Sequence, residues 1–203
     1  MIRNFLLDMG NVLLKWDPEY ILDQYTCDET ERQLLLSGLV QSPDWGRLDA
    51  GEIDHHEILR RAKARLPEWI YPLLTDVNET WPNHMPELPG ALEFVRDLHE
   101  NGMRAYLLSN AGTRFPACVM DRPVMQMLDG YLVSAHEKTV KPSPEIFRRA
   151  LEKFDLKAEE CLFLDDMPVN VAGAKACGIE ALVFDGDFAA LRRKLAQMGV
   201  RIS

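Results

Sequence analysis

Five short apolar runs recur along the chain, each bounded by polar or turn-forming residues. They span residues 5–7, 105–108, 131–133, 161–164 and 181–184. None shows the alternation of apolar and polar positions that marks a strand with one wet face. The pattern therefore predicts short strands that are buried on both faces of a parallel sheet.

Stripes of apolar residues at helical spacing separate these runs. They cover residues 88–98, 146–154, 169–176 and 188–198, and they predict helices before the second strand and after the third, fourth and fifth. Asn101-Gly102 and Gly178 follow two of the stripes, as residues that end helices do. The alternation predicts an α/β fold with a doubly wound, Rossmann-like parallel sheet, whose ligands bind beyond the carboxyl ends of the strands.

One segment breaks this rhythm. Roughly seventy residues, 16–85, separate the first strand from the helix that leads to the second, far more than an ordinary crossover needs. Residues 34–39 and 58–66 carry helical stripes, and several prolines mark the return. We expect a small helical cap domain at residues 16–85, inserted into a core domain made of residues 1–15 and 86–203.

Composition narrows the class of protein. The chain has 203 residues, 47% of them hydrophobic, and its four cysteines form no CxxC pair, so we expect free thiols and a cytoplasmic protein. Its net charge of −9 argues against a nucleic-acid partner. The N-terminal apolar run is too brief for a signal peptide, and no run approaches a membrane span. The oligomeric state is not readable from the sequence.

Carboxylates follow two of the predicted strands. Asp8 comes directly after the first strand, before a glycine-containing loop, and Asp165-Asp166 ends the fourth. Adjacent carboxylates repel each other, and a bound hard cation such as Mg²⁺ is the usual compensation. Taken alone, however, Asp8 could cap a turn and Asp166 could cap the next helix.

Two other segments supply groups that suit a phosphate. Ser109-Asn110 ends the second strand and offers a hydroxyl and backbone donors, while Lys141 stands just before a predicted helix. A lysine there could neutralise a carboxylate and a phosphate brought together. Each feature alone is also ordinary turn chemistry or solvated surface.

In combination, the four segments resemble the four motifs of the haloacid dehalogenase superfamily. The matching residues are the DxGNVL segment at 8–13, Ser109-Asn110, Lys141-Pro142 and the DDxxxN segment at 165–170. Residues 45–53 are similar to the cap of a sugar-phosphatase group that includes the bacterial α-glucose-1-phosphate phosphatases. The resemblance implies a Mg²⁺-dependent phosphatase that acts on a small phosphorylated metabolite, with a sugar phosphate favoured.

The resemblance also assigns roles to residues. It makes Asp8 the nucleophile that forms an aspartyl-phosphate, and Lys141 the cation that holds Asp8 and the phosphate together. The Mg²⁺ ligands that it implies are Asp8, the Gly10 carbonyl and Asp166, supported by Asp165 and oriented by Asn170. Ser109 and the backbone of Asn110 would bind the phosphoryl oxygens.

Gly10 departs from the pattern of many superfamily phosphatases, which carry an aspartate there as general acid and base. Losing such an acid commonly costs about 10²–10⁴-fold in rate unless another group replaces it. Three alternatives stay open. The first is a metal-independent haloacid dehalogenase, against which Asp165-Asp166 speaks; the others are a catalytically silent binding module and a phosphomutase.

The remaining aromatic and histidine residues give weaker signals. All four tryptophans, Trp16, Trp45, Trp69 and Trp81, fall in the predicted cap, where we expect most of them to form its core. Trp45 is the one candidate for contact with substrate. His55-His56 lies among acidic residues, and we interpret it as solvated surface rather than a metal site.

Overall fold

The computed structural model, which describes residues 1–202, contains one parallel sheet with the strand order β3-β2-β1-β4-β5. All five predicted strands are present, with bounds that differ from the apolar runs by one or two residues. They are β1 (Asn4–Leu7), β2 (Arg104–Ser109), β3 (Gly130–Val133), β4 (Cys161–Asp165) and β5 (Glu180–Val183).

Phe184, predicted as strand, lies just beyond β5. The predicted α/β fold is confirmed.

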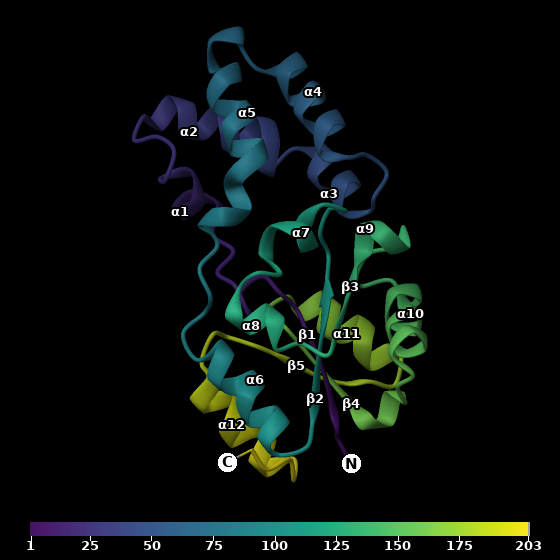
Figure 1. Ribbon diagram of the computed structural model, residues 1–203. Helices are drawn as coiled ribbons and strands as arrows, with labels where there is room; N and C mark the ends of the chain where they lie inside the picture. Colours follow the sequence, from purple (N-terminus) through teal and green to yellow (C-terminus); the bar gives the residue numbers. More distant parts are fainter. Residues whose placement is uncertain (203) are drawn as a thin grey trace.

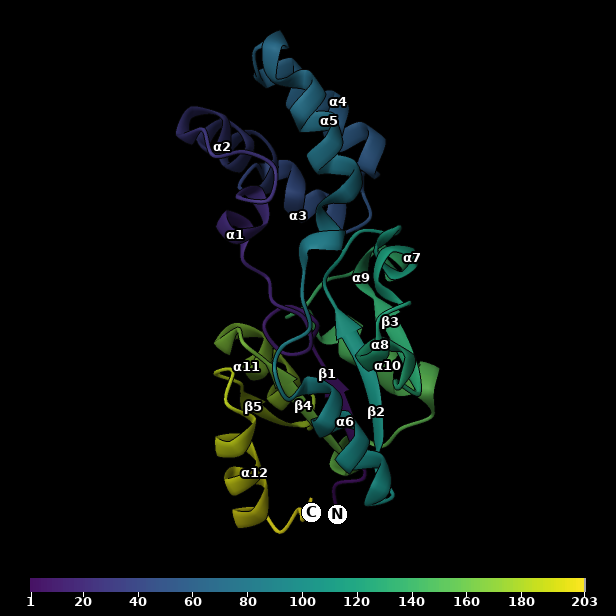
Figure 2. The ribbon, with the colours of Figure 1, turned by 60° about the vertical axis from the view of Figure 1, so that its left-hand side comes forward.

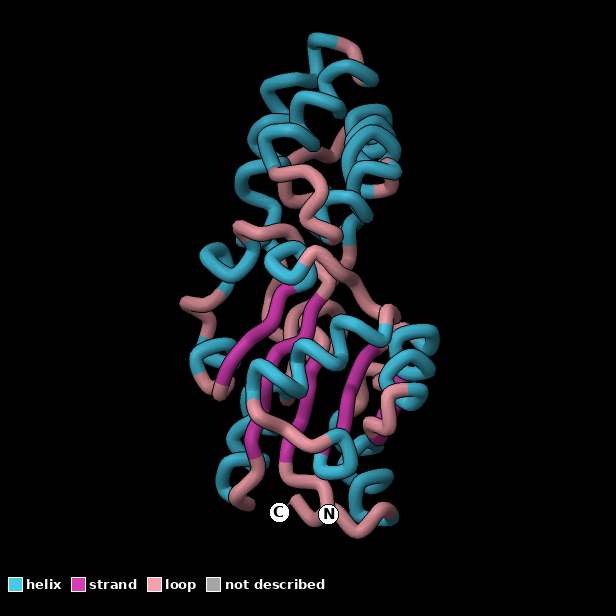
Figure 3. The backbone as a smooth tube through the Cα atoms, turned by 90° about the vertical axis from the view of Figure 1, so that its right-hand side faces the viewer, coloured by secondary structure: helices cyan, strands magenta, loops and turns pink. Residues whose placement is uncertain are grey.

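Helices cover both faces of the sheet (Figures 1 and 3). Successive side chains of a strand point to opposite faces, so Phe5 and Leu7 pack with one helical layer and Leu6 with the other. One layer contains α6 (Ala91–Glu100), α7 (Phe115–Val119), α8 (Pro123–Gln126) and α12 (Phe188–Gln197); the other contains α10 (Pro144–Phe154) and α11 (Pro168–Ala176). The short helices α9 (Ser134–Glu137) and η4 (Ala158–Glu160) complete this part of the chain.

A helical insert follows β1, as predicted, and lies beyond the edge where the parallel strands end (Figure 2). Its α-helices are α1 (Pro18–Leu22), α2 (Glu29–Leu35), α3 (Pro43–Asp49), α4 (His55–Arg65) and α5 (Tyr71–Thr80). Three short helices join them: η1 (Leu36–Val40), η2 (Glu68–Ile70) and η3 (Trp81–His84). The insert has an apolar core of its own, built from residues such as Leu35, Ile58 and Leu74.

The two connections between the sheet and the insert run side by side. The Lys15 amide donates to the Pro86 carbonyl at 2.8 Å, and the Leu88 amide donates to the Leu13 carbonyl at 2.9 Å. These bonds tie the outgoing and returning chains together at the base of the insert. The division of the chain into two domains at residues 15/16 and 85/86 stays a prediction.

The sequence predicted free thiols and no membrane-spanning run. All four cysteine thiols are free; Cys161 is buried, Cys118 and Cys177 are partly buried, and Cys27 is exposed. No helix within residues 1–202 combines the length and the apolar content that crossing a bilayer requires.

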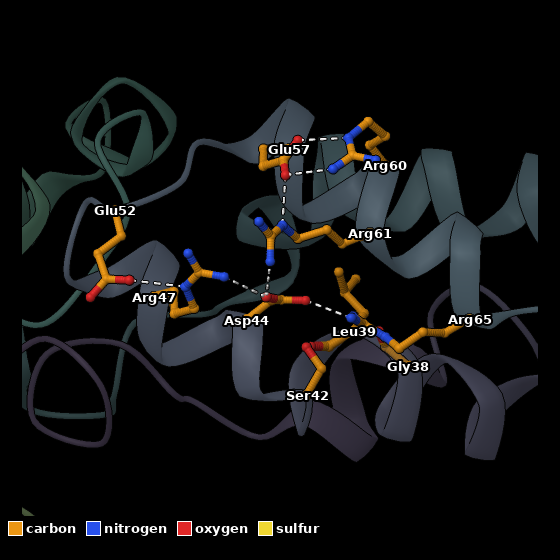
Figure 4. A network of polar contacts seen from close by, with 10 residues as sticks. All are labelled: Gly38, Leu39, Ser42, Asp44, Arg47, Glu52, Glu57, Arg60, Arg61 and Arg65. Carbon is orange, nitrogen blue, oxygen red and sulfur yellow. Dashed lines mark hydrogen bonds and ion pairs between the residues drawn. The ribbon is translucent and has the colours of Figure 1, made fainter.

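Asp44 anchors α3 to the rest of the insert (Figure 4). Only 5% of this residue is exposed, and its carboxylate accepts hydrogen bonds from Arg65 at 2.5 Å and from Arg61 at 3.2 Å, both on α4. Arg65 also donates to the Gly38 carbonyl at 3.0 Å. The Arg65 guanidinium holds the pKa of Asp44 below its usual range. The network therefore fixes α3 against α4 and η1.

Replacing this carboxylate should loosen the insert. We expect Asp44→Ala to lower the free energy of unfolding by about 1–3 kcal/mol, because it leaves Arg61 and Arg65 without their shared hydrogen-bond acceptor and removes an ion-pair partner of Arg47. Since the folded pKa of Asp44 is depressed, its contribution is present at neutral pH and is lost in acid, so the deficit should shrink below about pH 4. Chemical denaturation against pH measures this. Glu52→Gln, which alters an exposed pair with Arg47, is the control, and equal stability of both variants would refute the anchoring role.

Candidate active site

A cavity of about 330 Å³ lies between the carboxyl ends of the strands and the insert. The sheet side of its lining includes Asp8, Ser109, Lys141 and Asp166, which come from four segments far apart in the sequence. They meet because the parallel strands β1, β2 and β4 are neighbours and end at the same edge. The four motif segments singled out in the sequence thus face one space.

Lys141 lies at the centre of this arrangement and is only 4% exposed. Its ammonium group donates to Asp8 Oδ1 at 2.6 Å, to Asp165 Oδ2 at 2.7 Å and to the Leu108 carbonyl at 2.9 Å. Lysine has three N–H donors, so all of them have acceptors. Burial acts to lower the pKa of Lys141, but the carboxylates of Asp8 and Asp165 outweigh it and raise that pKa.

Burial and neighbouring charges act in opposite directions on the pKa of Asp8. It directly follows β1, and only 9% of it is exposed. Burial raises its pKa to about 6; Lys141 opposes that shift, and the charge of Asp165 adds to it. A carboxylate in such a place is held rigidly and is partly stripped of water, as an oxygen nucleophile needs to be.

Asp165 and Asp166 have different surroundings although they are adjacent. Asp165 is fully buried, and both its oxygens accept hydrogen bonds from Asn170, at 3.0 and 3.1 Å, besides those from Lys141 and the Met167 amide. Asp166 reaches the cavity and accepts one bond, from Asn11 at 3.0 Å. Asp165 therefore has protein partners throughout, whereas Asp166 retains free acceptor capacity.

A divalent cation fits the donors gathered here. Carboxylate oxygens of Asp8, Asp165 and Asp166 lie within 4.8 Å of one another. The Gly10 carbonyl accepts no hydrogen bond from the described residues, and it lines the same cavity. Hard oxygen donors of this kind, with room for water, suit Mg²⁺.

Ser109 and Asn110 end β2 but differ in their availability. The Ser109 hydroxyl makes no hydrogen bond within residues 1–202 and lines the cavity, so it is free to donate to an anion. The Asn110 side chain donates to the Lys141 carbonyl at 3.0 Å and accepts from the Lys141 amide at 2.8 Å. It fastens the segment that carries the central lysine to the end of β2.

Aromatic rings form much of the opposite wall. Trp16, Trp45 and Trp81 contact one another, with centroids 5.1–5.6 Å apart, and the Phe115 ring of α7 lies 5.3 Å from that of Trp81. All four line the cavity. Trp45, the candidate for substrate contact, lines the cavity; Trp16 and Trp81, expected in the cap core, line it as well, and Phe115 was not singled out from the sequence. The expectation of cap core is wrong for Trp69, which is 58% exposed because it lies in η2 on the surface of the insert.

Asp49, the last residue of α3, is the one acidic side chain that the insert contributes to the cavity lining. Its carboxylate has no hydrogen-bond or ion-pair partner among the described residues. Burial raises its pKa to about 7; the nearby charge of Asp8 adds to the shift, and Lys141 opposes it. Asp49 lies within residues 45–53, the cap segment similar to that of the sugar-phosphatase group, but the sequence alone assigned it no role.

His55 and His56 gain a neighbour that the sequence did not indicate. Glu79 of α5 lies close enough for the three side chains to share an ion. Its carboxylate, however, accepts from Arg114 at 2.8 Å, and a cation would compete with that guanidinium. The group lies outside the lining of the large cavity, with His55 and Arg114 beside a smaller hollow.

Comparison with known proteins gives a consistent family. A model of haloacid dehalogenase-like hydrolases matches residues 2–178. The chain is 24% identical over 178 residues to the sesquiterpene phosphatase astK of Aspergillus oryzae, covering 87% of each protein. It is 26% identical over 133 residues to a glyceraldehyde 3-phosphate phosphatase of Pyrococcus furiosus, spanning 63% of this chain and only 54% of that relative.

Among solved structures, the chain resembles a HAD family enzyme from Bacteroides thetaiotaomicron that was determined in complex with magnesium and inorganic phosphate. The TM-score is 0.70 at 22% identity, and the match covers 94% of this chain and 99% of the other. At this identity the likeness concerns the fold.

Removing the central cation should cost stability. We expect Lys141→Met to lower the free energy of unfolding by about 3–5 kcal/mol, because it leaves two buried carboxylates facing each other without their counter-charge. Adding Asp165→Asn to this variant should restore part of the loss, since one of the two charges is then gone. Urea denaturation of the single and double variants measures both effects, and an unchanged midpoint for Lys141→Met would contradict them.

Proposed function

The chain belongs to the haloacid dehalogenase-like hydrolases, and from that premise we propose that it is a Mg²⁺-dependent phosphatase of a small phosphorylated metabolite. The observation that carries the proposal is the convergence on one cavity of a buried carboxylate, Asp8, with a buried ammonium group, a free hydroxyl and a second carboxylate that retains acceptor capacity. This set can attack a phosphorus atom, hold its oxygens and balance their charge.

In the proposed first step, an oxygen of Asp8 attacks the phosphorus atom, and the bond to the leaving oxygen breaks. Its Oδ1 accepts from Lys141, which fixes the carboxylate and offsets the negative charge that gathers as the phosphate enters. The Ser109 hydroxyl would donate to one phosphoryl oxygen, together with backbone amides after β2. Water then hydrolyses the aspartyl-phosphate and returns Asp8 to its starting state.

We assign the metal to Asp8, Asp166 and the Gly10 carbonyl. When bound, Mg²⁺ would neutralise charge on the phosphoryl oxygens and the carboxylates. Asp165 supports this site from behind, because its oxygens are already engaged by Lys141, Asn170 and the Met167 amide. Asn170 therefore acts through Asp165 by fixing its orientation.

The aromatic wall supports a substrate whose body has an apolar face. Indole rings stack on the apolar faces of sugars, so Trp45 and its neighbours support the sugar phosphate that the cap resemblance favours. The same wall favours a second candidate, a phosphorylated alcohol with an apolar body, because Asp49 is the only charged side chain on the insert side of the lining. The similar proteins include a sesquiterpene phosphatase and a glyceraldehyde 3-phosphate phosphatase.

Metal dependence separates phosphatase from dehalogenase. We expect hydrolysis of p-nitrophenyl phosphate to stop with EDTA and to return with added Mg²⁺, because the carboxylates then regain their counter-charge. Asp8→Asn should lower turnover on the order of 10³-fold or more, since the amide cannot act as the nucleophile. EDTA-insensitive release of halide from a 2-haloacid would sink the proposal, as would equal inertness of wild type and variant across a panel of phosphate esters.

A substrate panel tests the role of the aromatic wall. We expect Trp45→Ala to raise KM for the best substrate about threefold to tenfold with little change in kcat, because the ring contacts the body of the substrate rather than the phosphate. Sugar phosphates and prenyl phosphates are compared in the same assay. Trp69→Ala, on the outer surface of the insert, is the matched control, and an identical KM for both variants would remove Trp45 from the binding site.

A further inference from the structure

The proposed reaction lacks a proton donor near residue 10. Gly10 has no side chain, and a Cβ added there would lie 3.3 Å from the Trp16 Cβ, a tight contact. When the P–O bond of an ordinary alkyl phosphate breaks, the alcohol leaves as a strongly basic alkoxide unless its oxygen is protonated. The donor must therefore come from another part of the cavity lining.

Asp49 meets the positional requirement. It lines the same cavity as Asp8 but comes from the insert, and its carboxyl lies close enough to Asp8 and Lys141 for their charges to act on it. A substrate whose phosphorus contacts Asp8 places its leaving group toward the insert. Because no described residue bonds to the Asp49 carboxyl, the group is free to exchange a proton with a ligand.

The backbone around Asp49 is fixed to the sheet side of the cavity. The Ser134 hydroxyl of α9 donates to the Asp49 carbonyl at 2.6 Å and accepts from the Ala111 amide at 3.0 Å. Ser134 is fully buried and thus joins Asp49 to the loop that follows Ser109-Asn110. An unpartnered carboxyl is therefore held on a backbone tied to the phosphate-binding loop.

Gly51 allows this close seating. Its φ is +66°, and a Cβ there would lie 2.2 Å from the Ala135 carbonyl oxygen, so any other residue would push the turn away from α9. Lys138 donates to the Gly51 carbonyl and adds a second tie. These contacts hold the turn after α3 against α9.

We propose that Asp49 is the general acid and base of the phosphoryl transfer, supplied by the helical insert in place of a side chain at residue 10. The inference rests on the proposed function and deepens it. It makes the position of the insert part of the chemistry, because the acid reaches the leaving oxygen only while the turn after α3 lies on α9.

The proton balance runs through both steps. As Asp8 bonds to phosphorus and the ester P–O bond breaks, the leaving oxygen takes the proton of the Asp49 carboxyl, and the alcohol departs. The Asp49 carboxylate then takes a proton from water as the water oxygen bonds to phosphorus. The Asp8–phosphorus bond breaks, phosphate leaves, and both carboxyl groups are back in their starting states.

The surroundings support a group that is protonated at the start. Burial and the charge of Asp8 raise the pKa of Asp49 to about 7, against the effect of Lys141. Asp8 and Lys141 are the charged groups of the core that act on Asp49; Asp166 lines the same cavity, and Lys138 is engaged by the Gly51 carbonyl. Arg47 of α3 and Glu52 of the turn that follows pair with each other at 2.9 Å. A carboxyl of this kind changes protonation near neutral pH, as a general acid and base must.

Asp49→Asn tests the assignment, because the amide keeps the shape and loses the acidic proton. With glycerol 2-phosphate, a poor leaving group, we expect kcat/KM to fall about 10²–10⁴-fold. With p-nitrophenyl phosphate, which leaves as a stable anion, the variant should release one p-nitrophenol per site at the wild-type rate and then turn over slowly. The wild-type pH profile for glycerol 2-phosphate should fall above about pH 7 as Asp49 ionises, and the variant should lack that limb.

Glu52→Gln is the matched control, since it removes an exposed carboxylate from the same turn, and it should behave as wild type in every assay. If Asp49→Asn slowed the first turnover of both substrates equally, or kept the alkaline limb of the pH profile, the role of Asp49 would be overturned. The phosphatase proposal would remain intact. A folded wild type that is inert toward both esters with Mg²⁺ would overturn the proposed function and this inference together.

Discussion

The Lys141 ammonium group is the contact on which the site depends. It donates hydrogen bonds to three segments at the sheet edge: to Asp8 after β1, to the Leu108 carbonyl of β2 and to Asp165 at the end of β4. Without this cation, two buried carboxylates at the ends of neighbouring strands would repel each other. The charge that stabilises the fold there is thus the same charge that the proposed chemistry uses to hold a nucleophile beside a phosphate.

The insert supplies what the sheet edge lacks. The sheet side offers carboxylates, a hydroxyl and the lysine, whereas the insert offers aromatic rings and the carboxyl of Asp49. Asp44 fixes α3 within the insert, and Ser134 fixes the end of α3 to the sheet side. Recognition of the substrate body and protonation of the leaving group would then depend on one short helix, α3, while phosphate binding depends on the strand ends.

The sheet and its motif residues were predictable from the sequence because the determinants are local. Runs such as residues 161–164 are apolar throughout, which fits strands covered on both faces, and parallel strands bring their carboxyl ends together. The docking of the insert was not predictable, because it depends on contacts across long separations. The bond from Ser134 to Asp49 joins residues 85 positions apart, and no local pattern marks Trp16 or Trp81 as cavity residues rather than core.

The central claim is that Asp8 accepts a phosphoryl group, and trapping that intermediate tests it most directly. The enzyme is mixed with Mg²⁺ and a substrate, quenched in acid within the first turnover, digested and examined by mass spectrometry. The account predicts one acid-stable, hydroxylamine-sensitive phosphoryl group on Asp8 that does not form without Mg²⁺. Turnover with Asp8 unmodified at every quench time, or an alkyl ester on Asp8 after incubation with a 2-haloacid, would contradict it.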